Sequence, residues 1–386
     1  MATQVHGTVA AGWEPVREEF AAFAAAAEHS PEAQLAVHHG GRRVVDLWAG
    51  EDTGPDTLTG VYSITKGAAH LVVALLVQDG RLDLERPVSA YWPEFTGHGK
   101  ERLTVRQLVA HRSGLVNTEE GFDYDEIADD ALIAARLAAA RPYWEPGTAY
   151  GYHAFVIGAL TGELVRRVTG RSLQEVYEER IRAPYGLDLY LGLPRELEGR
   201  WKPVLEMRAT PEQLAAAAGG GAALPELLPV AFNAHREPPM DLVAFANHPR
   251  VRELGPASAG GIGTARGVAG MYAAAIGAAD GRPALLEPGT AAEWARLHTP
   301  GEDRVTPQSD HFGLGFEQQP AVGPRAFGHS GAAGGLGWAD PATGIAYGYV
   351  RRRFAFPGGA APENERLTAA VLSAAAARTG GPAGAE

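Results

Sequence analysis

Apolar residues recur with two different periods along the chain, and each period predicts one kind of element. An amphipathic stretch at residues 15–27 has the helical period. Two short β-rich runs, 34–38 and 44–48, flank the turn sequence His39-Gly40-Gly41-Arg42 and predict an antiparallel hairpin. Residues 68–77 are apolar on nearly every side, which predicts a helix that is buried all round.

The segment from residue 82 to about residue 255 has a mainly helical pattern, punctuated by Pro and Gly. Residues 201–249 mix Ala-rich and Pro-rich pieces without a clear period, and we interpret them as an irregular elaboration near the substrate. Together with residues 122–125 and 305–311, they are expected to overhang the active site. The helices predicted in this part span residues 104–111, 125–141, 154–167 and 172–181.

The C-terminal part returns to short β-like runs between two helical stretches, 265–275 and 364–377. Strands at both ends with helices between them predict one sheet built from both termini. The expected fold class is α/β (α+β): a mixed, mainly antiparallel sheet flanked by helices (1–81 and 256–386), with an inserted, mostly helical domain (82–255). The strands predicted in the C-terminal part span residues 312–316, 325–329, 335–339 and 345–351.

Composition narrows the classes of protein. Of the 386 residues 45% are hydrophobic and 21% charged, as in an ordinary globular protein. A formal net charge of −12 disfavours nucleic acids and anionic membranes as partners. With no cysteine there can be no disulfide, thiolate metal site or cysteine nucleophile, and no histidine and carboxylate spacing predicts a metal or cofactor site.

The N-terminal residues lack the pattern of a signal peptide, and no run approaches the roughly 18 apolar residues of a membrane span. We therefore expect a cytoplasmic protein. The expected partner is a small-molecule substrate. The sequence carries no signal for an oligomeric state.

Ser63 and Lys66 carry the candidate chemistry. They stand three residues apart at the start of the predicted buried helix, so their side chains share one face. A serine hydroxyl is a weak nucleophile unless a base takes its proton, and a desolvated lysine can be that base. The backbone N–H of Ser63 would lie among the unpaired donors of the helix start, where an oxyanion is favoured.

The number of Ser-x-x-Lys pairs expected by chance shows how significant this pair is. Nine serines and three lysines in the chain predict roughly 0.07 pairs at this spacing, so the pair favours acyl transfer without proving it. The alternative is a serine that caps the helix beside an unrelated lysine.

Four segments, in this order, resemble the serine β-lactamase and penicillin-binding protein superfamily. Ser63-Ile64-Thr65-Lys66 resembles its S-x-x-K motif. Residues 108–115 resemble "LL-x-H-x-S-G-L", and residues 144–154 resemble "P-G-T" followed by "Y-x-N". Residues 327–332 resemble the third motif, which is H-x-G in the branch that contains class C-like esterases. Asp340-Pro341-Ala342-Thr343-Gly344 fits the hairpin that follows.

The resemblance implies a β-lactamase/transpeptidase-like fold and a role for Tyr152. In the family this tyrosine is a second general base or proton relay between the residues that correspond to Ser63 and Lys66. A phenol held beside a lysine ammonium would have its ionised form favoured. The alternative is a core tyrosine that precedes a helix.

The third motif implies further site residues. His329 and Gly331 would line the strand edge that faces the acyl group, with His329 a site-lining donor rather than a catalytic base. The backbone N–H of Ala332 would complete an oxyanion hole with that of Ser63.

One position departs from the family pattern. Ala154 stands where many β-lactamases and peptidases have the Asn of "Y-x-N", so a side chain that recognises amides is missing. His153, beside it, is a candidate substitute. Because esters need less help for their leaving group than amides do, the departure favours an esterase with at most weak β-lactamase activity.

Two other motifs fail. Gly328-His329-Ser330-Gly331-Ala332 nearly matches the G-x-S-x-G nucleophile elbow, but that triad needs a later histidine and none follows His329. The sequence Gly261-Ile262-Gly263-Thr264-Ala265-Arg266 has Arg266 at the third glycine position of a dinucleotide loop, and a helix start capped near Thr264 explains it better.

The sequence thus predicts a serine hydrolase that acts on small carboxylic esters through an acyl-enzyme on Ser63. Two alternatives stay open. A transacylase or cyclising acyltransferase would use the same acyl-enzyme but pass the acyl group to an amine or an alcohol. A binding or sensing protein would acylate once, for example with a β-lactam, and then stall.

Overall fold

A seven-stranded antiparallel sheet joins the two ends of the chain. The computed structural model describes residues 4–219, 224–277 and 282–379. The strand order is β1-β3-β2-β10-β9-β8-β7, so the N-terminal strand β2 pairs with the C-terminal strand β10. This confirms the predicted fold class. The strands are β1 (Val5–Val9), β2 (Ala33–His39), β3 (Arg42–Ala49), β7 (Glu317–Gln318), β8 (Phe327–Ser330), β9 (Leu336–Asp340) and β10 (Ile345–Arg351).

The hairpin between β2 and β3 forms as predicted. Its turn residues Gly40 and Gly41 have φ of 57° and 77°, in the left-handed region that glycine adopts without strain. Val37 pairs with Val45 but His38 pairs with Arg43, so Val44 is left over as a bulge in β3 next to the turn.

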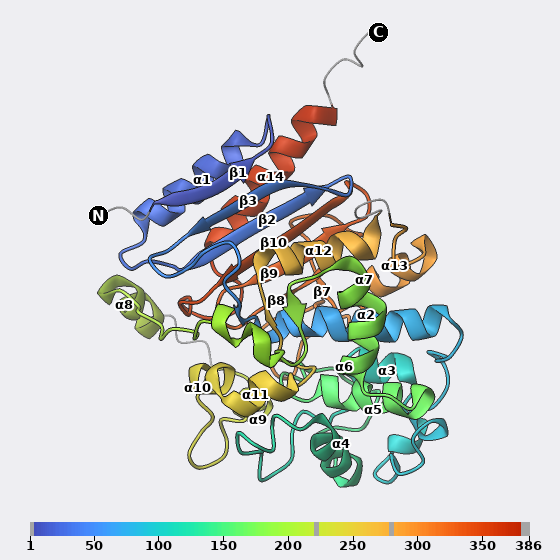
Figure 1. Cartoon of the computed structure of the whole chain (residues 1–386). Helices are drawn as coiled ribbons and strands as arrows, with labels where there is room; N and C mark the ends of the chain where they lie inside the picture. The colour runs from blue at the N-terminus through green and yellow to red at the C-terminus, as the bar shows by residue number, and fades with distance from the viewer. Residues whose placement is uncertain (1–3, 220–223, 278–281, 380–386) are drawn as a thin grey trace.

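Helices cover both faces of this sheet (Figure 1). The helices α1 (Glu14–Ala26) and α14 (Glu363–Thr379) pack on one face over a core that includes Leu47 and Tyr347. On the other face α12 (Ala265–Ile276) lies so close that a Cβ added at Gly348 would stand 2.5 Å from the carbonyl oxygen of Ala265. Glycine on β10 therefore sets the distance between sheet and helix.

The helix α2 (Thr65–Gln78) runs through the middle of the molecule (Figure 1), and all but its last two residues are buried. The helices α5 (Ile157–Thr169), α6 (Leu173–Tyr177) and α13 (Pro288–Ala295) pack against it, and α4 (Asp130–Ala139) packs on α5. The remaining helices are α3 (Val105–Val109), α7 (Ala183–Tyr185), α8 (Pro211–Gly219), α9 (Leu228–Ala231), α10 (Leu242–Asn247) and α11 (Pro249–Leu254).

A small three-stranded sheet joins three segments, which precede α2, follow α7 and precede α12. Its order is β4 (Thr59–Gly60), β6 (Ile262–Gly263), β5 (Leu189–Tyr190), and both pairings are antiparallel. One continuous apolar core includes residues of α2, α5 and α12, such as Leu71, Leu160 and Val268. The division of the chain into domains at residues 82 and 255 stays a prediction.

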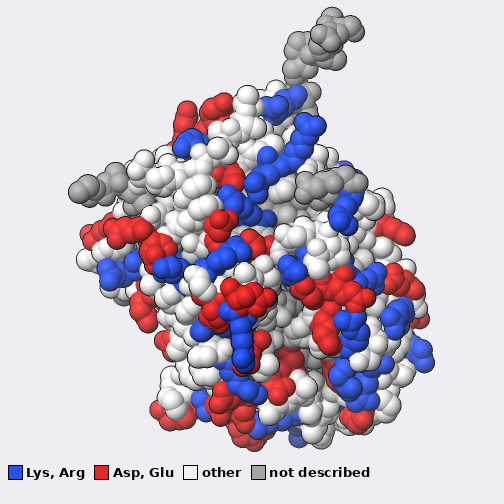
Figure 2. Space-filling model, viewed as in Figure 1, with Lys and Arg blue, Asp and Glu red and all other residues white. Residues whose placement is uncertain are grey.

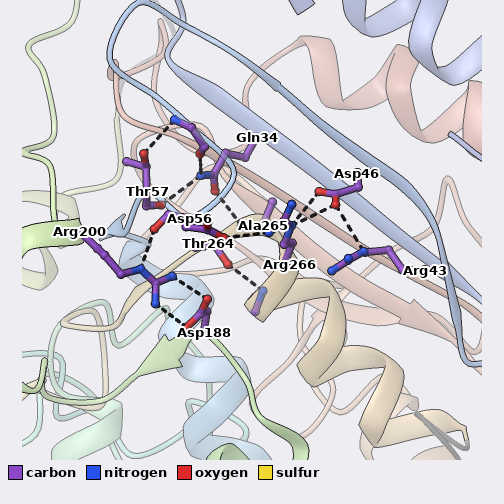
Figure 3. Close-up of polar contacts among 12 residues, drawn as sticks. Gln34, Arg43, Asp46, Asp56, Thr57, Asp188, Arg200, Thr264, Ala265 and Arg266 are labelled. Carbon is purple, nitrogen blue, oxygen red and sulfur yellow. Dashed lines mark hydrogen bonds and ion pairs between the residues drawn. The ribbon is translucent and has the colours of Figure 1, made fainter. Parts of the chain in front are cut away.

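Polar contacts also tie the sheet to its surroundings (Figure 3). The buried side chain of Gln34 donates to the carbonyls of Gly54 and Thr57 at 2.6 and 3.0 Å and accepts from the backbone N–H of Ala265 at 3.0 Å. Beside it, Arg266 pairs with Asp46 on β3 and with Asp56. These contacts hold β2, the 54–57 loop and the first turn of α12 in one arrangement.

The described surface mixes charges of both signs. On the face in Figure 2, Lys and Arg side chains lie among Asp and Glu side chains rather than in a separate patch. In the part of the chain that the structure describes, no helix combines the length and the apolar character that crossing a bilayer would require.

Three predicted elements differ from the observed ones. The helix predicted from residue 125 begins only at Asp130, because Asp129 caps it and the side chain of Asp123 holds a preceding turn. The helix predicted from residue 154 begins at Ile157, since residues 151–153 have no regular secondary structure and residues 154–156 form a turn. No strand forms at residues 312–316.

The reason for the missing strand is local. Gly315 has φ of 73°, and the chain turns so that the N–H of Gly313 donates to the carbonyl of Phe316 at 2.9 Å. Within the described part of residues 201–249, the short helices α8, α9 and α10 alternate with loops.

Candidate active site

A tight turn presents Ser63. The residue lies in a 3-10 turn (Tyr62–Ile64) directly before α2, and Tyr62 has φ of 51°, which is strained for a non-glycine residue. The hydroxyl of Thr65 donates to the carbonyl of Tyr62 and accepts from the N–H of Gly261, which lies 2.9 Å away. The turn is thus held from within and from the neighbouring segment.

Lys66 is fully buried one turn into the helix. Its Nζ lies 3.1 Å from Ser63 Oγ and donates to the carbonyl oxygens of Ala154 and Ser258 at 2.6 and 2.8 Å. Burial lowers the pKa of Lys66 to about 7, against the opposing effect of the Glu317 carboxylate. A neutral amine with both N–H groups on carbonyls turns its lone pair toward Ser63.

Tyr152 reaches the same hydroxyl from a distant segment. Its phenol oxygen lies 2.6 Å from Ser63 Oγ, and its ring lies 4.8 Å from Lys66 Nζ. The ring stacks on Phe312 at 5.6 Å and 13°, and the backbone N–H of Tyr152 donates to Asp303 at 3.1 Å. The structure therefore brings the three predicted groups together on one oxygen.

The protonation state of Tyr152 differs from the expectation. Burial, together with the negative charge of Glu317, raises the pKa of Tyr152. The prediction that the lysine ammonium favours the phenolate is wrong, because burial disfavours the charged forms of both groups. Tyr152 is a neutral phenol and Lys66 is the more readily deprotonated group.

His153 does not face the site. Its ring is fully buried, with Nε2 2.6 Å from Ser113 Oγ and Nδ1 2.6 Å from the carbonyl oxygen of Gly151. Tyr152 lines the cavity at Ser63, whereas His153 does not. The candidate role of His153 as a substitute for the missing Asn is therefore wrong.

The third motif lies beside Ser63 on β8 and the turn after it. His329 is fully buried behind the cavity, with Nδ1 2.9 Å from the carbonyl oxygen of Ser330, and burial lowers its pKa to about 4. It does not line the cavity, contrary to expectation. The N–H of Gly331 donates to Gly335 at 2.8 Å, so it is not a free donor either.

Ala332 does lie in the site. It lines the cavity with Ser63, and among the described residues no acceptor is hydrogen-bonded to its backbone N–H. Gly331, the residue before it, permits this placement, because a Cβ there would stand 2.5 Å from the carbonyl oxygen of Val61.

The cavity at Ser63 has a volume of about 130 Å3. Two of the segments that were expected to overhang the site contribute to its wall, 201–249 through Phe232 and 305–311 through three residues; residues 122–125 contribute none. Its lining residues are Ser63, Tyr152, Phe232, Thr306, Gln308, His311, Glu317, Ser330, Ala332 and Gly359.

Sequence reasoning missed Glu317, a buried carboxylate in this wall. Its oxygens accept from the N–H and the hydroxyl of Ser330 at 2.7 and 2.8 Å. Burial opposes the ionised form, but His329, His311 and these hydrogen bonds outweigh it and lower the pKa of Glu317 to about 2. No motif points to this residue, because its importance arises from packing between β7 and β8.

Within residues 4–219, 224–277 and 282–379, no three His, Asp or Glu side chains are placed to share a metal ion.

Comparisons with known proteins define the family. Residues 16–372 match the family described as Beta-lactamase, so the chain belongs to the β-lactamase family. Among curated proteins, the esterase/beta-lactamase LipL of Mycobacterium tuberculosis is 33% identical over 343 residues, which cover 84% of this chain and 77% of LipL.

Two solved structures are similar over nearly the whole chain. EstA from Arthrobacter nitroguajacolicus Rue61a is 41% identical with a TM-score of 0.86, covering 98% of this chain and 100% of that one. A family VIII carboxylesterase is 32% identical with a TM-score of 0.85, covering 96% and 100%.

Proposed function

We propose that this protein is a serine hydrolase that cleaves small carboxylic esters through an acyl-enzyme on Ser63. One observation carries the proposal: the hydroxyl of Ser63 lies between a buried amine and a buried phenol, at 3.1 and 2.6 Å. A structural serine has no need of two such partners. The similarity to LipL, EstA and the family VIII carboxylesterase supports an ester as substrate.

Acylation starts from neutral Lys66. Its lone pair accepts the proton of Ser63 as Oγ attacks the ester carbonyl carbon. The negative oxygen that forms is stabilised by the backbone N–H groups of Ser63 and Ala332. Tyr152 then donates its proton to the departing alcohol and recovers one from the Lys66 ammonium, whose Nζ lies 4.8 Å from the centre of the Tyr152 ring.

Esters are favoured over amides by what surrounds the site. The side chain of Ala154 offers no hydrogen bond, and its carbonyl is committed to Lys66. The hydroxyl of Ser330, the middle residue of the third motif, donates to Glu317. A cavity of about 130 Å3 fits a short ester.

Removal of the nucleophile by substitution of Ser63 tests the proposal. Ser63→Ala should lower kcat/KM for a short chromogenic ester on the order of 10³-fold or more, because the remaining groups bind but do not form a covalent bond. Ser373→Ala, at an exposed serine on α14, is the matched control and should keep full activity. Full activity in Ser63→Ala would end the proposal.

The two alternatives are separated in the same assay. An acyltransferase would form the ester or amide of an added alcohol or amine faster than free acid, and a sensing protein would stop after one equivalent of product. We expect continued turnover with free acid as the main product. A cytoplasmic location stays a prediction.

A further inference from the structure

His311 is the one histidine that lines the cavity at Ser63 in the described part of the chain. Its side chain is 23% exposed, whereas the neighbouring rings of His70, His111 and His329 are fully buried. It precedes Phe312, which stacks on Tyr152, and the two adjacent rings lie 4.3 Å apart. His311 therefore opens onto the space beside the catalytic oxygen.

A fixed carboxylate stands behind this ring. The Nε2 of His311 lies 3.7 Å from Oε1 of Glu317, and Ser330 holds Glu317 in place with two hydrogen bonds. The other ring nitrogen, Nδ1, forms no hydrogen bond with any of the described residues. A carboxylate at one nitrogen and a free second nitrogen is the arrangement of a general base.

The groups that perform acylation are poorly placed to activate a water molecule. Lys66 is fully enclosed, does not line the cavity and has two carbonyls on its N–H groups. Tyr152 lines the cavity, but as a neutral phenol it is a weak base. One water needs roughly 10–15 Å3, so the cavity of about 130 Å3 has room for a water beside a short acyl group.

We propose that His311 is the general base of the second half-reaction, the hydrolysis of the acyl-enzyme, and that Glu317 positions it. The inference rests on the proposed acyl-enzyme. An O–H bond of water breaks, Nδ1 of His311 takes the proton, and the oxygen bonds to the acyl carbon. The bond from that carbon to Ser63 Oγ then breaks and Oγ takes the phenol proton of Tyr152. The proton held by His311 passes back to Tyr152 through the cavity that both side chains line, so every group returns to its starting state.

Charged and titratable groups surround His311 from several elements. Glu317 lies on β7, His329 on β8, and Asp303 and Tyr150 on the segments that pack against the ring. Burial opposes protonation of His311, but Glu317 and Asp303 outweigh it and raise its pKa above the usual value. The neutral form needed here is therefore gained at a higher pH than for a free histidine.

The experiment compares wild type, His311→Gln and His6→Gln by stopped flow with p-nitrophenyl acetate. General-base catalysis contributes about 10²–10⁴-fold, so His311→Gln should lower kcat by at least about 10²-fold. KM should fall in proportion, kcat/KM should stay within about twofold, and a burst of p-nitrophenol with an accumulating acyl-enzyme should appear, because acylation continues. His6 is exposed on β1, and its variant should behave as wild type.

Glu317→Gln tests the positioning role. The pH at which kcat rises should shift downward, because His311 loses the carboxylate that raises its pKa, whereas a merely structural defect would lower kcat/KM without that shift. Unchanged kcat in His311→Gln, or an equal loss in acylation and turnover, would overturn the inference. Full activity in Ser63→Ala would instead refute the acyl-enzyme itself.

Discussion

Two backbone carbonyls, those of Ala154 and Ser258, determine how Lys66 acts. They accept both N–H groups of the neutral amine, so the lone pair has one remaining direction, toward Ser63. Burial lowers the pKa of the amine because it disfavours the charged ammonium form, and none of the described carboxylates forms an ion pair with it. The site thereby obtains a base near neutral pH without any histidine on the nucleophile.

A pH profile follows from this arrangement. The ammonium form of Lys66 cannot accept the proton of Ser63, so kcat/KM should be low in acid and rise as pH increases through about 7. In Lys66→Arg the guanidinium stays charged at every accessible pH, so activity should fall at least about 10²-fold and the rise should vanish. Measurement of kcat/KM for a short ester from about pH 5 to pH 9 checks both points. A flat wild-type profile would contradict the role of Lys66.

The predictability of the site residues depended on how local each signal is. Ser63 and Lys66 share one helical turn, so spacing alone brought them together. Tyr152 comes from a distant segment and could be predicted only through the family resemblance. Glu317 and Phe232 reach the cavity through tertiary packing that no pattern encodes. His153 was misplaced because its contact with Ser113, which holds its ring outside the cavity, also depends on tertiary packing.

At the scale of elements, the close approach of α5 to the 257–258 segment supports the base. A Cβ added at Gly158 would lie 2.2 and 2.3 Å from backbone atoms of Ala257 and Ser258, and the N–H of Gly158 donates to the Ser258 hydroxyl at 2.8 Å. The same segment provides the Ser258 carbonyl that holds Lys66. Helix packing and base orientation are therefore coupled.

Gly158→Ala should both destabilise and inactivate the protein. The added methyl group must push the 257–258 backbone away, at a cost of about 1–3 kcal/mol, and the displaced carbonyl should lower kcat/KM on the order of 10- to 100-fold. Urea unfolding and ester hydrolysis measure the two effects.

Gly162→Ala, one turn further on α5, is the control. A Cβ there would meet Leu173 at an ordinary 3.7 Å, so this variant should be neutral or stabilised by up to about 1 kcal/mol with full activity. Equal behaviour of the two variants would refute the coupling.

Element boundaries show where sequence patterns reach their limit. The hairpin of β2 and β3 and the buried helix α2 could be predicted, because their periods are strong and their ends carry turn residues. The late start of α4 could not, since the cap of Asp129 competes with the helical period of the residues before it. Residues 312–316 have β-forming residues, but Gly313 and Gly315 turn the chain there.

At the scale of the whole molecule, contacts between segments far apart in sequence hold the sheet to the elements around it. Gln34 is the clearest case: its side chain satisfies two carbonyls of the 54–57 loop and one N–H of α12 (Figure 3). The distribution of strands along the chain was enough to predict that strands from both termini form one sheet. The contacts of Gln34 could not be predicted, because they depend on the final register of β2.

Gln34→Leu should therefore destabilise the protein on the order of 3 kcal/mol, because it leaves two carbonyls and an N–H without partners in a buried position. Chemical unfolding measures this loss. Gln4→Leu, at an exposed position next to β1, should change stability by less than about 0.5 kcal/mol. A loss below about 1 kcal/mol in Gln34→Leu would show that the joint is not structural.

The central claim is that Ser63 carries the acyl group. The direct measurement is acid quench of the wild type during turnover of p-nitrophenyl acetate, followed by trypsin digestion and mass spectrometry. Cleavage after Arg43 and Lys66 gives a peptide in which Ser63 is the single serine. We predict an acetyl group on Ser63 in the wild type, more of it in His311→Gln and none in Ser63→Ala. An acetyl group on another residue, or turnover with Ser63 unmodified in both active proteins, would contradict the claim.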